Sequence, residues 1–272
     1  MIHKCHHNYG RSVALSEAGE TILPIAREVL RSARVLDNGL REVNNHIGGE
    51  FLIGCSTSAG KCLLPVLLAR FRTDFPLARP SVRVIGPEGV HERLLDQTIP
   101  IGVTSNEIEH RDLECLPLFD DRIILIVPAR HPWAAFGHAV PDDLLDQPII
   151  MREQIAGTYE TALTDLKARG ITPDMLNVAM DLGNPEAIEM AVELGVGLAF
   201  ISEMVAARGL AMGSVRRVEL DGFDPHRTFY TARNLNIDIT RAQALFWEFA
   251  QAQREHLNAD SWDSLVNFAE PD

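Results

Sequence analysis

A regular spacing of apolar residues runs along the N-terminal part of the chain, from Ser16 to Ile47. Apolar side chains recur there at alternating intervals of four and three residues, at Ile22, Ala26, Val29, Ala33, Leu36, Leu40, Val43 and Ile47. A sustained repeat of about 3.5 residues is typical of a helix that packs along a partner helix. We therefore predict a long amphipathic helix over residues 16–48 that joins two copies of the chain.

The predicted helix has a clear end and an irregular start. Gly48 and Gly49 end it, and Ser16 is a suitable N-cap. Gly19 and Pro24 disfavour the first turns, which predicts a late start or a kink there. A surface helix over the protein's own core is the alternative interpretation. The spacing alone leaves open whether paired helices run parallel or antiparallel.

Short apolar runs and segments of helical periodicity alternate along the rest of the chain. We predict strands at 11–15, 51–55, 81–86, 99–104, 113–119, 122–127, 148–151, 177–181, 198–201, 215–220 and 227–232. We predict helices at 59–75, 90–96, 141–145, 157–169, 184–194 and 239–256, and a turn at 131–134. Asn184 is expected to cap the helix that begins there, with Pro185 at its first position. The β-α-β-α-β order after residue 50 is typical of a parallel sheet with helices on both faces.

These elements group into two units, so the predicted fold class is α/β with two lobes. Lobe 1 comprises residues 50–123 together with 223–256, lobe 2 comprises residues 124–222, and an acidic tail occupies 257–272. Two lobes joined by crossing strands form a clamp. We expect a small ligand between them, at helix N-termini that face the cleft.

The charge of the chain excludes several functions. The net charge is −13, and nearly all of it falls outside residues 1–47, which are almost neutral. An acidic body of this kind is not expected to bind nucleic acid by itself, since that affinity depends on neutralising phosphates. The sequence has no apolar run long enough to span a membrane and no signal peptide, so we expect a cytoplasmic protein.

Cysteine and histidine show no pattern typical of a metal or redox site. Four cysteines, at positions 5, 55, 62 and 115, form no CxxC pair, so we expect buried thiols in a reducing compartment. The N-terminal residues His3, Cys5, His6 and His7 carry metal-ligand side chains, but their spacing matches no common site. We expect neither a metal nor a cofactor.

Polar residues follow a strand or begin a helix at four points along the predicted cleft. They are Ser56 with Thr57 and Ser58, Thr104 with Ser105, Gly157 with Thr158, and Asn184. Hydroxyl groups beside free backbone N–H groups form a site for an anion or a carboxylate. For Ser58 the alternative is that it only caps its helix, because serine is a common N-cap.

Motifs typical of catalysis are absent from the sequence. It contains no GxGxxG, no phosphate-binding loop and no GxSxG, and its histidines lie at no readable motif spacing. Asp120 and Asp121 are adjacent carboxylates, but neighbouring strand residues point to opposite faces of a sheet. A turn or a crossing between lobes is the better interpretation, and we do not expect an enzyme.

Several segments together resemble the LysR-type transcriptional regulators. They are Arg11-Ser-Val-Ala-Leu-Ser-Glu-Ala-Gly-Glu20, the long helix, the strand that ends in a Ser/Thr-rich turn, Leu64-Pro65 with Leu68-Ala-Arg-Phe71, Phe75-Pro76, His131-Pro-Trp-Ala134, and Asn184-Pro-Glu-Ala-Ile188 with Val192-Glu-Leu-Gly-Val-Gly197. The resemblance covers residues 10–256.

The resemblance implies a winged helix-turn-helix, a linker helix that pairs antiparallel, and a two-lobed effector domain of the type 2 periplasmic-binding-protein kind. It implies a homodimer or tetramer that changes its hold on promoter DNA when a small effector binds. Residues 1–15 then correspond to a remnant of the winged helix-turn-helix. The whole motif needs about 50 more residues before Arg11, so DNA contact is expected only through that missing part.

Site residues follow from the resemblance by position. Ser56 and Ser58 correspond to the effector-binding turn of the family, and Ser105 to the rim after the third strand. Arg152 and Thr158 bound the loop that leads into the lobe 2 helix.

Two positions depart from the family. Ala156 stands where a serine is common, and Pro100 replaces a frequent aspartate. The effector class therefore stays open, and a small anion or carboxylate is the expectation. The alternative functions are an enzyme or a solute-binding protein for transport on the same two-lobed fold.

Overall fold

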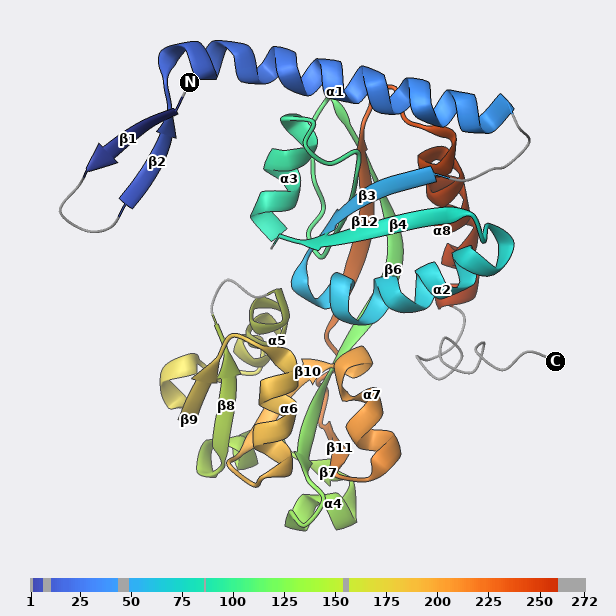
Figure 1. Cartoon of the computed structure of the whole chain (residues 1–272). Coiled ribbons are helices and arrows are strands. Elements are labelled where there is room, and N and C mark those ends of the chain that lie inside the picture. The colour runs from blue at the N-terminus through green and yellow to red at the C-terminus, as the bar shows by residue number, and fades with distance from the viewer. Residues whose placement is uncertain (1, 7–10, 44–48, 86, 154–156, 259–272) are drawn as a thin grey trace.

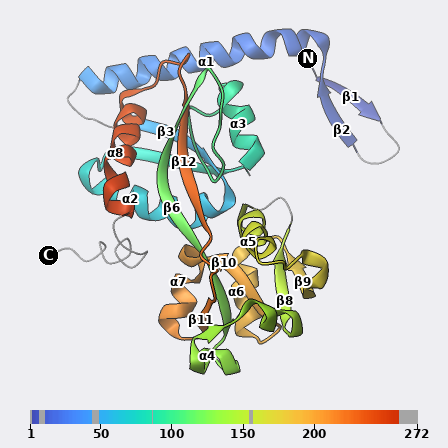
Figure 2. The same ribbon diagram turned by 180° about the vertical axis from the view of Figure 1, so that it is seen from behind.

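The computed structural model describes residues 2–6, 11–43, 49–85, 87–153 and 157–258. Two lobes lie end to end, and a two-stranded hairpin and a long helix precede them (Figures 1 and 2). Most of the predicted acidic tail and the predicted helix end at residue 48 lie outside the described ranges, as do Ile47 and Ala156. The two-lobed α/β fold that the sequence predicts is confirmed.

The N-terminal hairpin pairs β1 (Ile2–His6) with β2 (Arg11–Leu15) in antiparallel register, with Ile2 opposite Leu15. The predicted strand at 11–15 is confirmed. β1 was not predicted, because its polar and apolar residues do not alternate as they do in a half-buried strand.

The long helix α1 spans Glu17–Val43 and continues through Pro24. Ser16 accepts a hydrogen bond on its Oγ from the backbone N–H of Gly19 at 3.2 Å, so it is the N-cap. The predicted late start is wrong, because this cap stabilises the first turn despite Gly19. α1 lies across the end of lobe 1 that is farthest from lobe 2 (Figures 1 and 2).

Lobe 1 is a mixed sheet in the order β4-β3-β5-β12-β6. Its parallel strands are β3 (Gly49–Cys55), β4 (Ala78–Val84) and β5 (Ile101–Thr104), next to antiparallel β12 (His226–Asn234) and the first part of β6 (Leu113–Pro128). Its helical segments are the π-helix η1 (Ala59–Leu63), α2 (Leu64–Asp74), α3 (Pro87–Leu95) and α8 (Arg241–Asn258).

Alternate residues of β3 divide the core of lobe 1 into two layers. Phe51 packs with α2 and α8, where the ring of Phe71 meets those of Phe51 and Phe246 edge-on at 5.9 and 5.5 Å. Leu52 packs instead with Val90 of α3 on the other face. The period of two along the strand thus buries both faces of the sheet, as the predicted β-α-β order requires.

Lobe 2 repeats this plan around the second part of β6. Its strands are β7 (His138–Ala139), β8 (Pro148–Arg152), β9 (Asn177–Leu182), β10 (Leu198–Ser202) and β11 (Val215–Leu220). Its helical segments are α4 (Pro132–Phe136), η2 (Pro141–Asp146), α5 (Gly157–Lys167), η3 (Pro173–Met175), α6 (Pro185–Glu193) and α7 (Glu203–Met212). On β6, Leu125 packs under α5 and Ile124 under α6 and α7.

The connection between the lobes differs from the prediction. We predicted two strands at 113–119 and 122–127, but β6 is one strand of 16 residues that passes from one lobe to the other. β12 pairs beside it from His226, opposite Arg122, to Asn234, opposite Leu113. The strand continues through Asp120 and Asp121 because both carboxylates find hydrogen-bond donors there.

Two further segments correct the sequence analysis. Residues 131–134 were predicted as a turn, but His131 caps the short helix α4 by accepting a hydrogen bond from Trp133 N at 3.2 Å. α7 was not predicted, although Pro185 begins α6 and Asn184 caps it as expected. α7 has only 10 residues and contains Gly209, which disfavours a helix in the sequence. In the structure Gly209 lies in close contact with Glu189.

Candidate effector-binding site

The candidate site lies where the two lobes meet at the first turn of α5. A Cβ atom placed on Gly157 would lie 3.4 Å from Ser105 Oγ and 3.5 Å from Arg227 Nη1. Ser105 follows β5 in lobe 1, Gly157 begins α5 in lobe 2, and Arg227 belongs to the crossing strand β12. Three separate parts of the fold therefore converge at this point.

The rim of lobe 1 contributes hydroxyl groups at the ends of parallel strands. Ser56 follows β3 and donates its backbone N–H to Val103 O at 3.0 Å, which places it beside Thr104 at the end of β5. Ser56 and Thr104 are both buried. Ser56 Oγ has no hydrogen-bond partner among the described residues, so this buried hydroxyl is available to a ligand.

Ser58 directly precedes η1 at its N-cap position, but its backbone is already helical. Its φ and ψ are −66° and −41°, and within the described chain its hydroxyl makes no capping hydrogen bond. The alternative that Ser58 only caps its helix is therefore wrong. Thr57 precedes it and is half-buried.

The turn after β5 is internally hydrogen-bonded. Thr104 Oγ1 accepts from Asn106 N at 3.3 Å, and Ser105 Oγ donates to Asn106 Oδ1 at 3.5 Å. Thr104 thus shapes the turn that carries Ser105 towards α5. A ligand here would meet the half-buried hydroxyl of Ser105 more directly than the buried one of Thr104.

Lobe 2 contributes a buried cation. Arg152 ends β8, and its Nη2 lies 3.7 Å from Glu153 Oε1, while its Nε has no hydrogen-bond partner in the described part of the chain. Burial lowers the pKa of Arg152, Glu153 opposes that effect, and the charge of Arg227 lowers the pKa further. The two guanidinium groups are therefore electrostatic neighbours, a position that an anion would stabilise.

A buried network at the crossing was missed by the sequence analysis. Asp121, of which 1% is exposed, accepts from Arg227 Nε at 2.8 Å and from Ser202 Oγ at 2.7 Å. Arg227 Nη2 remains without a hydrogen-bond partner among the residues described. The signal in the sequence was an aspartate beside the apolar run of β6, which we interpreted as a turn or a crossing.

The neighbouring carboxylate serves a different purpose. Asp120 is exposed and accepts from Thr228 Oγ1 at 2.7 Å, whereas Asp121 points into the junction. The prediction that the two carboxylates lie on opposite faces is confirmed, and the interpretation as a lobe crossing is the correct one.

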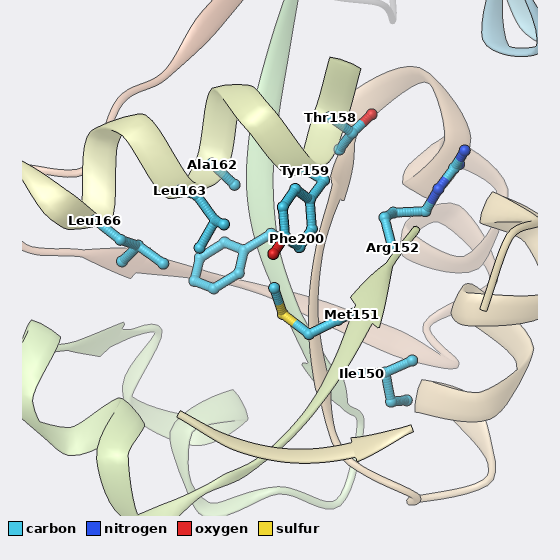
Figure 3. A pocket seen from close by; sticks show the side chains of 9 residues that line it. All are labelled: Ile150, Met151, Arg152, Thr158, Tyr159, Ala162, Leu163, Leu166 and Phe200. Carbon is cyan, nitrogen blue, oxygen red and sulfur yellow. The ribbon is translucent and has the colours of Figure 1, made fainter. Parts of the chain in front are cut away.

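An apolar pocket in lobe 2 adjoins this site (Figure 3). It is lined by Ile150, Met151, Tyr159, Ala162, Leu163, Leu166 and Phe200, with Arg152 and Thr158 at one end. The side chain of Arg152 points away from the apolar lining in Figure 3, and the buried Thr158 lies on the first turn of α5. The pocket therefore changes from apolar to polar towards the junction.

Asn184 has a structural role at the start of α6, besides its predicted role in effector binding. It is exposed, and its Oδ1 accepts from the backbone N–H groups of Glu186 and Ala187 at 2.9 and 3.1 Å. This carbonyl oxygen is committed to the start of α6. Whether Asn184 also contacts an effector stays a prediction.

The remaining predicted features concern thiols, metals and membranes. Cys55, Cys62 and Cys115 are free thiols, and burial raises the pKa of Cys55 and of Cys62 to about 12. In the described ranges, no group of three or more His, Cys, Asp and Glu side chains is placed to hold a metal ion. A search of the described helices finds none that is both long and apolar enough to cross a membrane.

The fold and the junction together define a two-lobed ligand-binding protein. Residues 44–255 match the LysR substrate binding domain, which covers more than half of the chain. The chain belongs to the LysR family of transcriptional regulators, and residues 44–255 are its substrate-binding domain. This agrees with the resemblance identified in the sequence.

Individual relatives agree with this assignment. The chain is 26% identical over 242 residues to a "Probable RuBisCO transcriptional regulator" of Cyanophora paradoxa, which covers 88% of this chain and 75% of that protein. The fold is similar to the CcmR regulatory domain of Synechocystis PCC6803 in complex with 2-PG, with a TM-score of 0.66, 23% identity, and coverage of 77% of this chain and 99% of that one. It is also similar to the effector binding domain of QuiR in complex with shikimate, with a TM-score of 0.65, 18% identity, and coverage of 78% and 99%.

Proposed function

We propose that this chain is the effector-sensing and oligomerisation part of a LysR-type regulator, and that it binds a small carboxylate or other anion between its lobes. The anion would meet Ser56, Ser105 and the first turn of α5, together with Arg152 and Arg227. The remaining predicted residues Thr57, Ser58, Thr104, Thr158 and Asn184 surround this position or support the elements that form it.

The observation that carries this proposal is a set of buried polar atoms without partners. Among the described residues, Ser56 Oγ, Arg152 Nε and Arg227 Nη2 are buried and accept or donate no hydrogen bond. Leaving a buried donor unsatisfied costs about 1–3 kcal/mol. An acceptor that reaches all three would remove this cost, and carboxylate and phosphate oxygens are the acceptors that guanidinium groups match best.

The electrostatics of the junction favour an anion over a neutral ligand. The charge of Asp121 is directed at Arg227 Nε, which leaves the other side of that guanidinium to a ligand. The N-terminus of α5 adds the positive end of a helix dipole, worth about 0.3–1 kcal/mol for a nearby negative charge. The complexes named for CcmR and QuiR, with 2-PG and shikimate, support a small ligand in a domain of this fold.

Calorimetric titration with a panel of small carboxylates and inorganic anions tests the proposal. Ser56→Ala should weaken every anion that binds by about 1 kcal/mol or more, because it removes a hydrogen bond to a charged group. Ser81→Ala is the matched control, since Ser81 is an exposed serine on the edge strand β4. Equal affinities for the wild type and Ser56→Ala would remove Ser56 from the site.

The other functions that we propose follow from this role. The heptad residues of α1 would join two copies into a homodimer, which can assemble further into a tetramer. Promoter DNA would be bound through a helix-turn-helix. Because a regulator must reach promoter DNA, we propose that the protein acts in the cytoplasm. We propose no catalytic activity, because among the described residues the one buried carboxylate at the junction, Asp121, is held by Arg227 and Ser202 and is not placed to act as a free acid or base.

A further inference from the structure

An ion pair joins the two lobes at the helical segment that follows the predicted effector-binding turn. Lys61 Nζ lies 2.5 Å from Glu186 Oε2. Lys61 belongs to η1 in lobe 1, and Glu186 to the first turn of α6 in lobe 2. The side chains are 29% and 47% exposed, so both partners can also be reached from solvent.

The segment that carries Lys61 has an unusual conformation. η1 is a π-helix that directly follows the predicted effector-binding turn at Ser56 and Ser58. π-helical turns are rare and occur frequently at functional sites. The next residue, Cys62, packs against the hydrophobic cores of both lobes. η1 therefore contacts lobe 2 through Lys61 and Cys62.

Glu186 is within electrostatic reach of cations from both lobes. It forms the ion pair with Lys61, and its charge raises the pKa of Arg152, opposing the effect of burial. It also adds to the raised pKa of Cys62, next to Lys61. Glu186 thus pairs with Lys61 of lobe 1 and acts electrostatically on Arg152 of lobe 2, and these are cations that an incoming carboxylate or phosphate would attract.

We propose that Glu186 is an internal competitor of the effector anion, and that Lys61 is the cation for which the two compete. The inference rests on the proposed anion site between the lobes. When the anion binds, it replaces Glu186 as the ion-pair partner of Lys61. The charge of Glu186 then repels the ligand. Lys61 is then a further specificity-determining residue that favours ligands with more than one negative oxygen.

This mechanism predicts opposite effects for the two halves of one ion pair. Glu186→Gln removes the competitor and should strengthen binding of inorganic phosphate by about threefold or more, the scale expected for a partly exposed charge. Lys61→Met removes the attracting cation and should weaken binding by a similar factor of about three. A pair that only held the lobes together would shift affinity in one direction for both variants.

Calorimetric titration of the whole chain with inorganic phosphate, at constant ionic strength maintained with chloride, is the test. Glu92→Gln on α3 and Lys167→Met at the end of α5 are the matched controls, because both side chains are exposed and neither lies at the Lys61–Glu186 pair. Both controls should bind phosphate like the wild type. Melting temperatures of all variants establish that each is folded.

Each outcome of the titration decides something. Tighter binding by Glu186→Gln together with weaker binding by Lys61→Met supports the inference, as does binding by Glu186→Gln alone when the wild type shows none. Weaker binding by both variants, or no change in either, overturns it and leaves the proposed function standing. Failure of the wild type and of every variant to bind phosphate or any member of the anion panel overturns the proposed function and this inference together.

Discussion

Two regions of this protein depart from the usual burial of apolar side chains and exposure of polar ones. One exposes apolar residues and the other buries polar atoms. α1 exposes apolar residues, with Ile22 and Val29 being 45% and 62% exposed in the single chain. The junction between the lobes buries the atoms Ser56 Oγ, Arg152 Nε and Arg227 Nη2, which have no hydrogen-bond partner among the described residues. Exposed apolar area and buried unsatisfied polar atoms are both unfavourable, so we propose that each region has a binding partner.

The comparison shows what each region lacks. The heptad spacing of α1 in the sequence predicts a long apolar stripe that a second helix can cover, which is a hydrophobic and largely non-directional requirement. The junction presents fixed N–H and O–H groups from three parts of the fold, which is a directional requirement that a few ligand oxygens can meet. The first feature fits assembly and the second fits recognition of a small molecule.

The largest effect is expected at the buried ion pair of the junction. Arg227→Met leaves the buried Asp121 without its cation and should lower the free energy of unfolding by about 3–5 kcal/mol, as measured by urea denaturation. On the same strand, Arg233 pairs with Glu114 at 2.6 Å, but both side chains are partly exposed. Arg233→Met should therefore cost only about 1 kcal/mol.

A second variant separates loss of charge from loss of packing. Asp121→Asn combined with Arg227→Met removes the unpaired charge and should recover most of the lost stability. Equal costs for Arg227→Met and Arg233→Met would contradict the idea that burial sets the junction apart.

The next largest effect is expected on assembly through α1. Val29→Asp places a charge in the predicted seam and should raise the dimer dissociation constant by about thirtyfold or more, because a charge buried between helices costs several kcal/mol unless it is paired. Sedimentation analysis over a range of protein concentrations measures this constant. Thr21→Asp, an exposed residue on the same helix outside the seam, is the control.

Either of two results would refute the predicted dimer interface along α1. If the wild-type chain stays monomeric at all concentrations, the heptad spacing does not form a dimer interface. If Val29→Asp leaves the dimer dissociation constant unchanged, the subunits make contact elsewhere.

The smallest effect is expected at Asn184, where a role in α6 and a predicted role in effector binding can be separated. Asn184→Ala removes the cap of α6 and should lower the free energy of unfolding by about 1 kcal/mol. Because its carbonyl oxygen is already bonded to the backbone of α6, anion affinity should stay the same in calorimetry. A clear loss of affinity would instead give Asn184 the contact that the sequence predicts, with Asn177→Ala on β9 as the control.

Local patterns in the sequence were enough for most of the fold. The heptad spacing predicted α1, the Asn184–Pro185 pair predicted the start of α6, and alternating strands and helices predicted two α/β lobes. These features depend on period, caps and turn chemistry, which act over a few residues and are therefore visible in the chain itself. Ser56 and Ser105 were predicted for the same reason, since each follows the end of a predicted strand, whereas Arg152 was predicted only from the family resemblance.

Only the tertiary structure decided how the junction is built. Asp121 and Arg227 are 106 residues apart, and Lys61 and Glu186 are 125 apart, so no local spacing connects them. β6 continues through Asp120 and Asp121 because Thr228, Ser202 and Arg227 supply hydrogen bonds there, whereas in the sequence the same two aspartates indicate an interruption. Burial and pairing of charges depend on what packs nearby, and that is set by the arrangement of the whole chain.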